Sequence, residues 1–411
     1  MPRPQHRPFA LAAATILASL AIVGIASPAQ AATLTVGPTG TYLTISAAVA
    51  AATAGDTITV ADGTYAESVG IDKAITLAGA TPRGAIITGA VTLSAPAAVT
   101  GLSIAGGVVI NPAGAGSLVT DNTIFSAGQL VVIVGTPLSG TVRTVVAGNT
   151  LENVGAAGQP NGLFLNGASS VDIVGNIIRN AGAVPANSVG VNVANGLGDI
   201  VINGNTISGF ENAIAVFSTA APTITAIEID SNTISNTTNS AVVFSNANLA
   251  DVAVTNNSFT SVGTSGPTRA AVQVGVPGLP APTGSPALDA LVVDGNTVTT
   301  APNGVVFSPG VVLADDESAV VSNNRFAGVT GNAIAVDPSV NASVAAPGND
   351  FGGAAVAGAV VVTAAAAPAP APVLAATGVA DPAPFAAGAL LLLLAGLLLI
   401  RGRRVNGLRA S

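Results

Sequence analysis

Three acidic residues, Asp172, Glu228 and Asp230, lie two or four residues before an Asn that recurs along the chain. Asp172 and Glu228 share the same offset two repeats apart, so strands stacked side by side would place their backbones about 10 Å apart. Two carboxylates at that separation could serve an inverting glycosidase or hold a cation. The structural alternative is a solvated β-face whose scattered acids oppose aggregation.

The composition excludes several reaction classes. Cys is absent, and the only His is His6, within a segment that we expect to be removed. Ser-His-Asp and Cys-His catalysis, His-ligated zinc and disulfides therefore have no residues to use, and we expect no cofactor. Residues 32–377 hold six basic and nineteen acidic residues, a formal charge of −13. This charge argues against nucleic acid as a partner, because phosphates would be repelled.

The recurring Asn marks an internal repeat. Successive copies are 25 to 29 residues apart, with one interval of 39, and an apolar residue follows two positions after each Asn. Residues three and five positions before the Asn are mostly apolar as well, which is typical of a strand with one buried face. We expect these Asn to form a structural ladder between coils, because Asn tolerates left-handed backbone and its amide can bond the next copy. The predicted ladder consists of Asn122, Asn149, Asn176, Asn205, Asn232, Asn257, Asn296, Asn324 and Asn349.

A second short strand falls between successive Asn, as in Gly162–Leu165 and Ala241–Phe244. Repeats of this length, without helical periodicity, indicate a parallel β-helix. A leucine-rich repeat is the alternative solenoid, but its Leu-rich consensus and helical half are absent. The sequence predicts an all-β domain of about ten coils over residues 34–351, within a domain spanning 32–362. A Pro-rich, Gly-rich insertion from Gly263 to Leu288 is expected to bulge out as a loop.

The opening segment carries a family resemblance. Residues 40–80 (GTYLTISAAVAAATAGDTITVADGTYAESVGIDKAITLAGA) resemble the first coil of the right-handed parallel β-helix superfamily that includes pectate lyases. The resemblance implies a capping helix over Ile45–Ala52 and turns at Gly55–Ile58 and Asp62–Tyr65. This fold hosts lyases, hydrolases, esterases, adhesins and inert scaffolds, so it leaves the activity open.

The resemblance also implies what a catalytic member would need. Lyases of the superfamily use a basic catalytic residue and acidic calcium ligands, yet no Arg or Lys shares the offset of Asp172 and Glu228. Aromatic platforms for sugars are also scarce, because both Tyr belong to the opening coil.

The N-terminus predicts export. Arg3 and Arg7 precede an apolar run from Phe9 to Ile25, and Ala29–Ala31 offers a small-residue cleavage site, so residues 1–31 are predicted to be a signal peptide.

The C-terminus predicts anchoring. An Ala/Pro-rich spacer (363–373) precedes the pentapeptide Leu374-Ala375-Ala376-Thr377-Gly378, a predicted hydrophobic transmembrane segment (379–400) and a basic tail (401–411) that is expected to stay cytoplasmic. This order resembles that of sortase substrates, in which the enzyme cuts after Thr, here Thr377, and joins it to peptidoglycan. Ala375 stands where Pro is commoner. The alternative is a permanent transmembrane helix, although the uncharged stretch Phe385–Ile400 is short for a bilayer.

We therefore expect an extracellular protein held at the wall or membrane of a Gram-positive type bacterium. Its partners would be a sortase, peptidoglycan and the membrane, with a polysaccharide as possible ligand. The β-helix is expected to act as a non-catalytic structural, adhesive or glycan-binding module. The alternative is a polysaccharide lyase or glycoside hydrolase that uses Asp172, Glu228 and Asp230.

Overall fold

The computed structural model describes residues 31–126, 128–135, 142–154, 160–195, 198–217, 224–245, 248–275 and 287–363. They belong to the first of two units of the chain, Met1–Ala365. The predicted spacer from residue 364 on, the pentapeptide, the apolar segment and the basic tail lie outside these residues, as does the signal peptide up to residue 30. Among the helices of the described ranges, none is long and apolar enough to cross a membrane.

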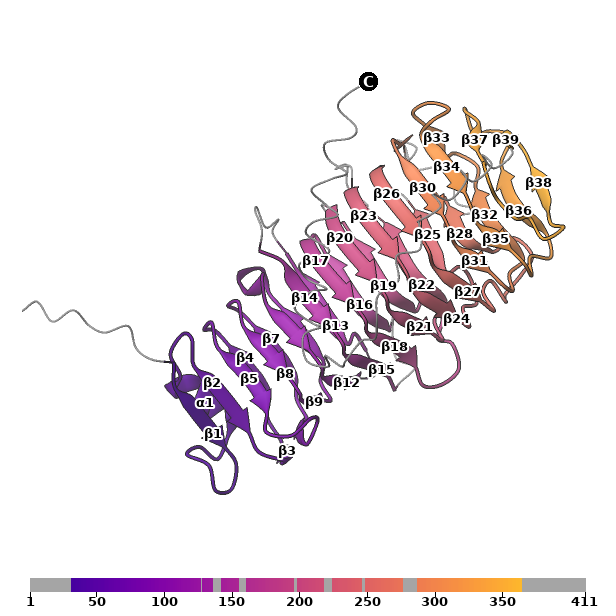
Figure 1. Cartoon of the computed structure of the whole chain (residues 1–411). Coiled ribbons are helices and arrows are strands. Elements are labelled where there is room, and N and C mark those ends of the chain that lie inside the picture. The colour runs from indigo at the N-terminus through magenta and orange to yellow at the C-terminus, as the bar shows by residue number, and fades with distance from the viewer. Residues whose placement is uncertain are drawn as a thin grey trace, which may run out of the picture. The chain divides into compact units, whose positions relative to one another are not determined.

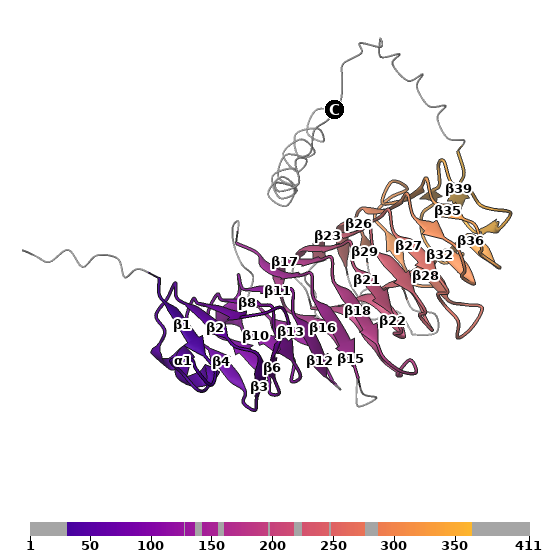
Figure 2. The same ribbon diagram turned by 60° about the horizontal axis from the view of Figure 1, so that its bottom comes forward.

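The described residues form a solenoid of three parallel sheets, which we name sheets A, B and C. Each coil contributes one strand to each sheet in turn, and strands from successive coils pair in parallel (Figures 1 and 2). Sheet B holds eleven strands, one from each complete coil, close to the ten expected. The predicted all-β, parallel architecture is confirmed for these residues.

Sheet A contains the longest strands and carries the predicted acids on its outer face. Its main path consists of β1 (Thr33–Val36), β2 (Thr57–Val60), β5 (Thr76–Gly79), β8 (Ala98–Thr100), β11 (Leu118–Thr120), β14 (Thr144–Ala147), β17 (Ser169–Val174), β20 (Gly198–Asn203), β23 (Ile224–Asp230), β26 (Leu249–Thr255), β30 (Leu291–Asp294), β34 (Ala319–Ser322), β37 (Val344–Ala345) and β39 (Val360–Val361). Two short strands, β29 (Ala287–Leu288) and β33 (Val312–Leu313), pair beside this path.

Sheet B follows sheet A after the turn that contains the recurring Asn. Its strands are β3 (Gly63–Tyr65), β6 (Ala85–Ile87), β9 (Ser103–Ile104), β12 (Thr123–Ser126), β15 (Thr150–Asn153), β18 (Ile177–Asn180), β21 (Thr206–Ser208), β24 (Thr233–Ser235), β27 (Ser258–Thr260), β31 (Thr297–Val298) and β35 (Arg325–Phe326). Residues Gly63–Tyr65, expected within a turn, form the first of these strands.

Sheet C completes each coil. Its strands are β4 (Val69–Ile71), β7 (Val91–Leu93), β10 (Val108–Ile110), β13 (Val131–Val134), β16 (Asn161–Asn166), β19 (Val189–Ala194), β22 (Asn212–Phe217), β25 (Val242–Ser245), β28 (Ala270–Val274), β32 (Asn303–Phe307), β36 (Asn332–Val336) and β38 (Ala355–Ala357). Strand β28 lies within the insertion expected over Gly263–Leu288, so only part of that interval leaves the solenoid; residues 276–286 lie outside the described ranges.

The core is one apolar column inside the coils. The apolar residue two positions after each recurring Asn is buried in most coils, for example Ile124, Ile207 and Phe326 at 1% exposure or less. Side chains alternate between the inner and outer faces along a strand, so every second residue of a strand faces the core. Equivalent positions of successive coils stack in this way and bury a continuous apolar column.

A helix closes the first coil. Helix α1 (Ile45–Ala51) buries Ile45, Ala48 and Val49, and the Thr44 hydroxyl accepts a hydrogen bond from the Ala47 N–H. A short 3₁₀ helix, Pro112–Gly114, connects β10 to sheet A. The predicted helix over Ile45–Ala52 is thus present and ends one residue earlier.

Candidate functional site

The nine recurring Asn lie at the turn between sheets A and B and bond to one another. The Asn122 N–H donates to Asn149 Oδ1 at 2.9 Å, and the same bond joins each further Asn to the next, up to Asn324 and Asn349. Each side-chain amide also donates to a carbonyl of the preceding coil, and each except that of Asn349 donates to the next Asn; Asn205 Nδ2, for example, reaches Ile173 O at 2.9 Å. The ladder is a structural device.

The left-handed backbone expected at the ladder Asn lies one residue earlier. None of the nine Asn has a positive φ; the residue before each one does, at +54° to +70°. Those positions hold Gly in five coils, such as Gly175, and Asp, Ser or Asn in the other four, such as Asp121 and Ser231. The left-handed residue turns the chain, and the Asn that follows satisfies the buried polar groups of the turn.

The predicted acids Asp172 and Glu228 project from the outer face of sheet A. Asp172 pairs with Val201, and Val201 pairs with Glu228, so the two acids share one row two strands apart. Asp230 belongs to the neighbouring row, between Asn203 and Thr255. Sequence offsets place all three residues correctly relative to one another but give no indication of their partners.

Asp172 is paired with Arg143. The comparison of sequence offsets does not predict this partner. Arg143 Nη2 lies 2.7 Å from Asp172 Oδ1, and Arg143 Nε donates to Asp172 Oδ2 at 2.8 Å. Arg143 Nη1 binds Asp199 Oδ2, and Nη2 donates to the carbonyl of Val171. One guanidinium therefore joins three consecutive coils.

This ion-pair cluster is partly shielded from water. The side chain of Arg143 is 16% exposed, that of Asp172 23% and that of Asp199 36%. Burial alone would lower the pKa of Arg143, but hydrogen bonds and charge from Asp172, and then from Asp199, raise it. Arg143 is therefore a fixed cation with its donors directed at the protein.

Two members of this cluster share a third spacing from the recurring Asn. Arg143 and Asp199 each lie six residues before a recurring Asn. The residues at that offset in the next coils, Ser170, Asp199, Ala226 and Asp251, have left-handed backbone, with φ between +54° and +55°. Arg143 has no such backbone conformation; it directly precedes β14, and its side chain reaches Asp172 on β17 and Asp199 on β20.

Asp230 is also bonded within the protein. It accepts hydrogen bonds from Thr255 Oγ1 (2.6 Å), Ser231 Oγ (2.8 Å), Asn203 Nδ2 (2.9 Å) and Asn256 Nδ2 (2.9 Å). Burial alone would raise the pKa of Asp230, but these four bonds outweigh it and lower the pKa. A carboxylate held ionised in this way is poorly suited to donate a proton as a general acid.

Glu228 is the exception among the three acids. Its side chain is exposed, and no hydrogen bond or ion pair joins it to another residue in the described ranges. Within those ranges, no group of three His, Cys, Asp or Glu side chains could hold a metal ion.

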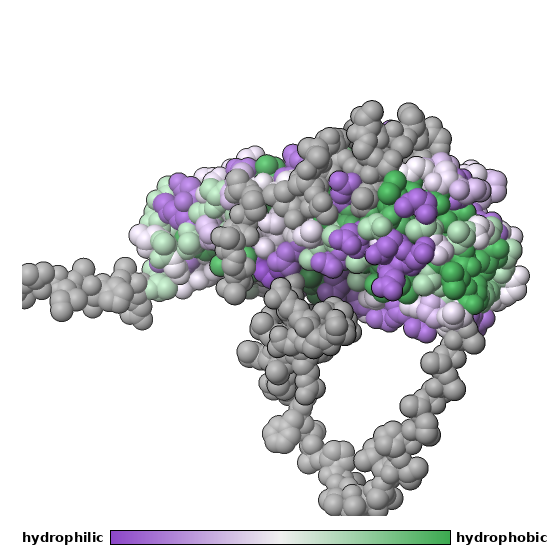
Figure 3. All heavy atoms as spheres, turned by 90° about the horizontal axis from the view of Figure 1, so that it is seen from above, coloured by the Kyte–Doolittle hydropathy of each residue, from purple (hydrophilic) through white to green (hydrophobic). Residues whose placement is uncertain are grey.

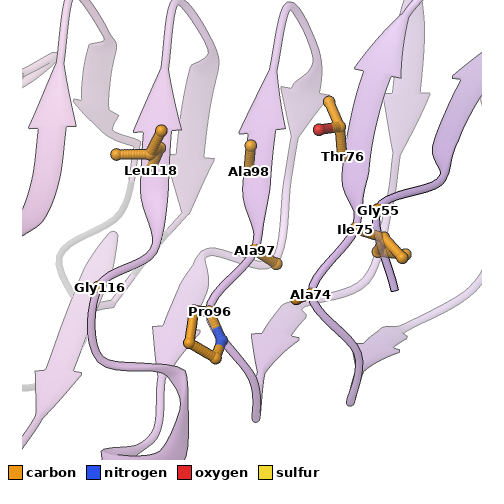
Figure 4. A pocket seen from close by; sticks show the side chains of 9 residues that line it. All are labelled: Gly55, Ala74, Ile75, Thr76, Pro96, Ala97, Ala98, Gly116 and Leu118. Atoms are coloured by element: carbon orange, nitrogen blue, oxygen red, sulfur yellow. The ribbon is translucent and has the colours of Figure 1, made fainter. Parts of the chain in front are cut away.

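A shallow pocket of about 240 Å³ lies elsewhere, along the first coils at sheet A. Ala74, Pro96, Ala98 and Leu118 line it, and Thr76 supplies the one side-chain oxygen visible in Figure 4. Without titratable residues, this pocket has no means of acid–base chemistry. On the part of the face coloured in Figure 3, hydrophilic and hydrophobic residues are intermixed, and hydrophobic ones gather at the C-terminal end of the solenoid.

The chain is similar to several solved structures. The Agl-KA catalytic domain matches at 13% identity and a TM-score of 0.45, over 77% of this chain and 64% of that one. The catalytic domain of a GH87 α-1,3-glucanase gives 14% and 0.40, over 75% and 63%. The A-module of the Azotobacter vinelandii mannuronan C-5 epimerase AlgE4 gives 16% and 0.42, over 77% and 90%. The chain thus spans less than two thirds of the first two.

The sequence comparisons give one match. No curated protein sequence matches the chain. The family model described as a right handed beta helix region matches residues 104–273, which run from β9 into β28, and this agrees with the three parallel sheets observed there.

Proposed function

We propose that the β-helix is a non-catalytic, polysaccharide-binding module displayed outside the cell. The observation that supports a non-catalytic role is the engagement of the outer acids: Asp172 is paired with Arg143, and Asp230 accepts four hydrogen bonds. Asp172 is thus engaged in an ion pair within the protein, and the four hydrogen bonds of Asp230 lower its pKa, which makes it a poor proton donor. A rigid solenoid repeats each outward position once per coil, and a polymer with its own repeat is the ligand that uses such a surface fully.

The binding role is tested by incubating the full chain, in mild detergent, with insoluble polysaccharides. Depletion of the protein from solution, without release of reducing or unsaturated sugars, is expected. Release of such sugars by the wild-type chain would contradict the non-catalytic part of the proposal.

The second candidate is a polysaccharide lyase or hydrolase of the pectate-lyase-like type. One observation favours it: a cation, Arg143, lies against Asp172, and the unbonded Glu228 occupies the same row two strands away. An enzyme using this set should lose at least about a hundredfold in rate on Glu228→Gln, the effect of removing a general acid or base. Product formation that survives Glu228→Gln would exclude this site.

We also propose that the mature protein is attached covalently to the wall through Thr377. The proposal rests on the order of pentapeptide, apolar segment and Arg-rich tail, since a permanent membrane anchor needs no pentapeptide. Cells would be extracted with hot detergent, and the remaining wall digested with a muramidase. Wild-type chain should appear in the muramidase fraction and Thr377→Ala in the detergent fraction. Complete extraction of both by detergent would mean that the protein is held only by the membrane.

A further inference from the structure

The outer face of sheet B carries a regular array of hydroxyl groups over four successive coils. Strands β21, β24, β27 and β31 align residue by residue, and two outward rows run across them. The first row consists of Thr206, Thr233, Ser258 and Thr297, and the second of Ser208, Ser235, Thr260 and Thr299. Parallel strands put neighbouring hydroxyls about 4.8 Å apart within a row, and the two rows about 6.6 Å apart.

Most of these hydroxyls have unused hydrogen-bonding capacity. Thr260 and Thr299 bond to each other at 2.7 Å, and Thr299 also donates to Phe259 O. The six others form no side-chain hydrogen bond within the described residues, and each of the eight is at least partly exposed. A hydroxyl offers one donor and two acceptors and can rotate to suit a partner. The array therefore differs from sheet A, where Asp172 and Asp230 are bonded within the protein.

The array is uncharged, although the chain is acidic. The charged residues that border it along the solenoid are paired with opposite charges: Arg179 with Glu152 at 2.6 Å and Arg325 with Asp350 at 3.7 Å. At the adjoining edge of sheet A lie Asp230 and Asp294, which would repel an anionic polymer. The charge distribution thus matches a neutral partner and disfavours an anionic glycan or an anionic membrane.

We propose that this hydroxyl array on sheet B binds a neutral, hydroxyl-rich polysaccharide whose chains lie flat along the solenoid. The inference rests on the proposed polysaccharide-binding function and assigns it a face and a ligand class. Single hydrogen bonds between neutral groups contribute little, so affinity must come from many sugar units engaging several coils at once. Long or crystalline polymers should bind, and short oligosaccharides should compete poorly.

The test compares binding of the full chain, in mild detergent, to microcrystalline cellulose and chitin with binding to calcium alginate and calcium pectate gels. The triple variant Thr206→Val, Thr233→Val, Thr297→Val removes three hydroxyls while keeping side-chain shape and β-propensity. It should weaken binding to the neutral polymers by about tenfold. The matched control is Thr100→Val with Thr120→Val on sheet A, whose hydroxyls bond each other at 3.1 Å; it should bind like wild type.

Thermal melts establish that the variants are folded. Ser235→Lys places a long charged side chain in the middle of the array and is a second test of binding at this face. Equal binding of wild type, the triple variant and Ser235→Lys would show that another face binds glycans; the inference would then be wrong while the proposed function stood. Retention on the anionic gels alone would have the same meaning. If no polysaccharide retains the chain, the proposed function itself fails. Reshaping of ice crystals by wild type alone, without glycan binding, would show that the array orders water instead.

Discussion

An asparagine side chain offers two donors and an acceptor, and the ladder uses them fully. Asn205 Oδ1 accepts from the backbone N–H and from the side-chain Nδ2 of Asn176. Asn205 Nδ2 donates to Asn232 Oδ1 and to the carbonyl of Ile173. These groups are buried, so each needs a partner in place of water. Asp would have no N–H to give, and Ser would be too short to reach both neighbouring coils.

Replacing Asn205 by Ala should therefore lower the free energy of unfolding by several kcal/mol, about 1–3 for each buried group left unpaired. The matched control is Asn203→Ala, two residues earlier on the outer face, which loses one partly exposed bond to Asp230. We expect a loss of about 1 kcal/mol or less there. Chemical denaturation measures both, and equal losses would mean that the ladder adds nothing beyond an ordinary surface bond.

Asp230 makes stability depend on pH in a predictable direction. Its pKa in the folded chain is lowered from the ordinary value of 3.8. Its contribution is therefore complete above that value and is lost as pH falls through the lower folded pKa. Asp230→Asn should be less stable than wild type at neutral pH, and the difference should shrink as the pH falls below 3.8. Denaturation series at neutral and strongly acidic pH test this; a difference that is independent of pH would exclude the carboxylate charge as its cause.

At the scale of the strand and turn, the left-handed residue before each ladder Asn fixes the corner between sheets A and B. Gly175 occupies this position at φ +62°, and a methyl group added there would meet nothing within 4 Å. Gly175→Ala therefore isolates the backbone cost, and we expect the free energy of unfolding to fall by about 1 kcal/mol.

The control for this change is Gly70→Ala on β4. Gly70 has equally open space around it but an ordinary backbone conformation. Gly70→Ala should leave the free energy of unfolding unchanged or raise it by up to about 1 kcal/mol, because Gly loses more chain entropy on folding than Ala does. Thermal melts of both variants give the comparison, and a destabilised Gly70→Ala would mean that crowding or sheet pairing, rather than φ, decides these effects.

The elements could be predicted from sequence because each leaves a periodic trace. Alternation of apolar residues marks the buried face of a strand, and the Asn interval marks one coil, so rows such as Asp172, Val201 and Glu228 follow from counting. The contacts of Arg143 could not be predicted in this way. They depend on the reach of the Arg143 side chain to acids in the next two coils, which strand periodicity does not reveal. Ala226 likewise gives no sign in the sequence that its backbone is left-handed.

The hydroxyl array on sheet B could not be predicted from the sequence either. Thr and Ser at outward positions are ordinary strand formers, so their presence in the sequence carries no functional signal. Only the register of four strands, together with the absence of side-chain partners for six of the hydroxyls in the described residues, distinguishes an open array from a self-bonded one.

At the scale of the whole described solenoid, stability is transmitted from coil to neighbouring coil. Each coil contacts mainly the coils before and after it, so an end coil lacks one neighbour and opens more readily than a central one. Helix α1 covers the N-terminal end and is held from the next coil at both of its own ends. The Glu67 carboxylate accepts from the N–H groups of Ile45 (2.8 Å) and Ser46 (3.0 Å), and Lys73 Nζ donates to three carbonyls at the helix C-terminus, each at 2.9 Å.

Weakening this attachment should open the end of the solenoid alone. Glu67→Gln removes the negative charge that the helix N-terminus favours, at a cost of about 1 kcal/mol. Amide hydrogens of Ile45–Ala51 should then exchange roughly fivefold faster, because local opening becomes more frequent by the same free energy. Protection in β20 to β27 should not change, since several coils separate those strands from the helix. The matched control is Glu228→Gln, which removes the same charge from a residue without partners in the described ranges and should leave both regions as they are. Faster exchange throughout the solenoid in Glu67→Gln would mean that the coils unfold as one cooperative unit and that the helix stabilises all of them.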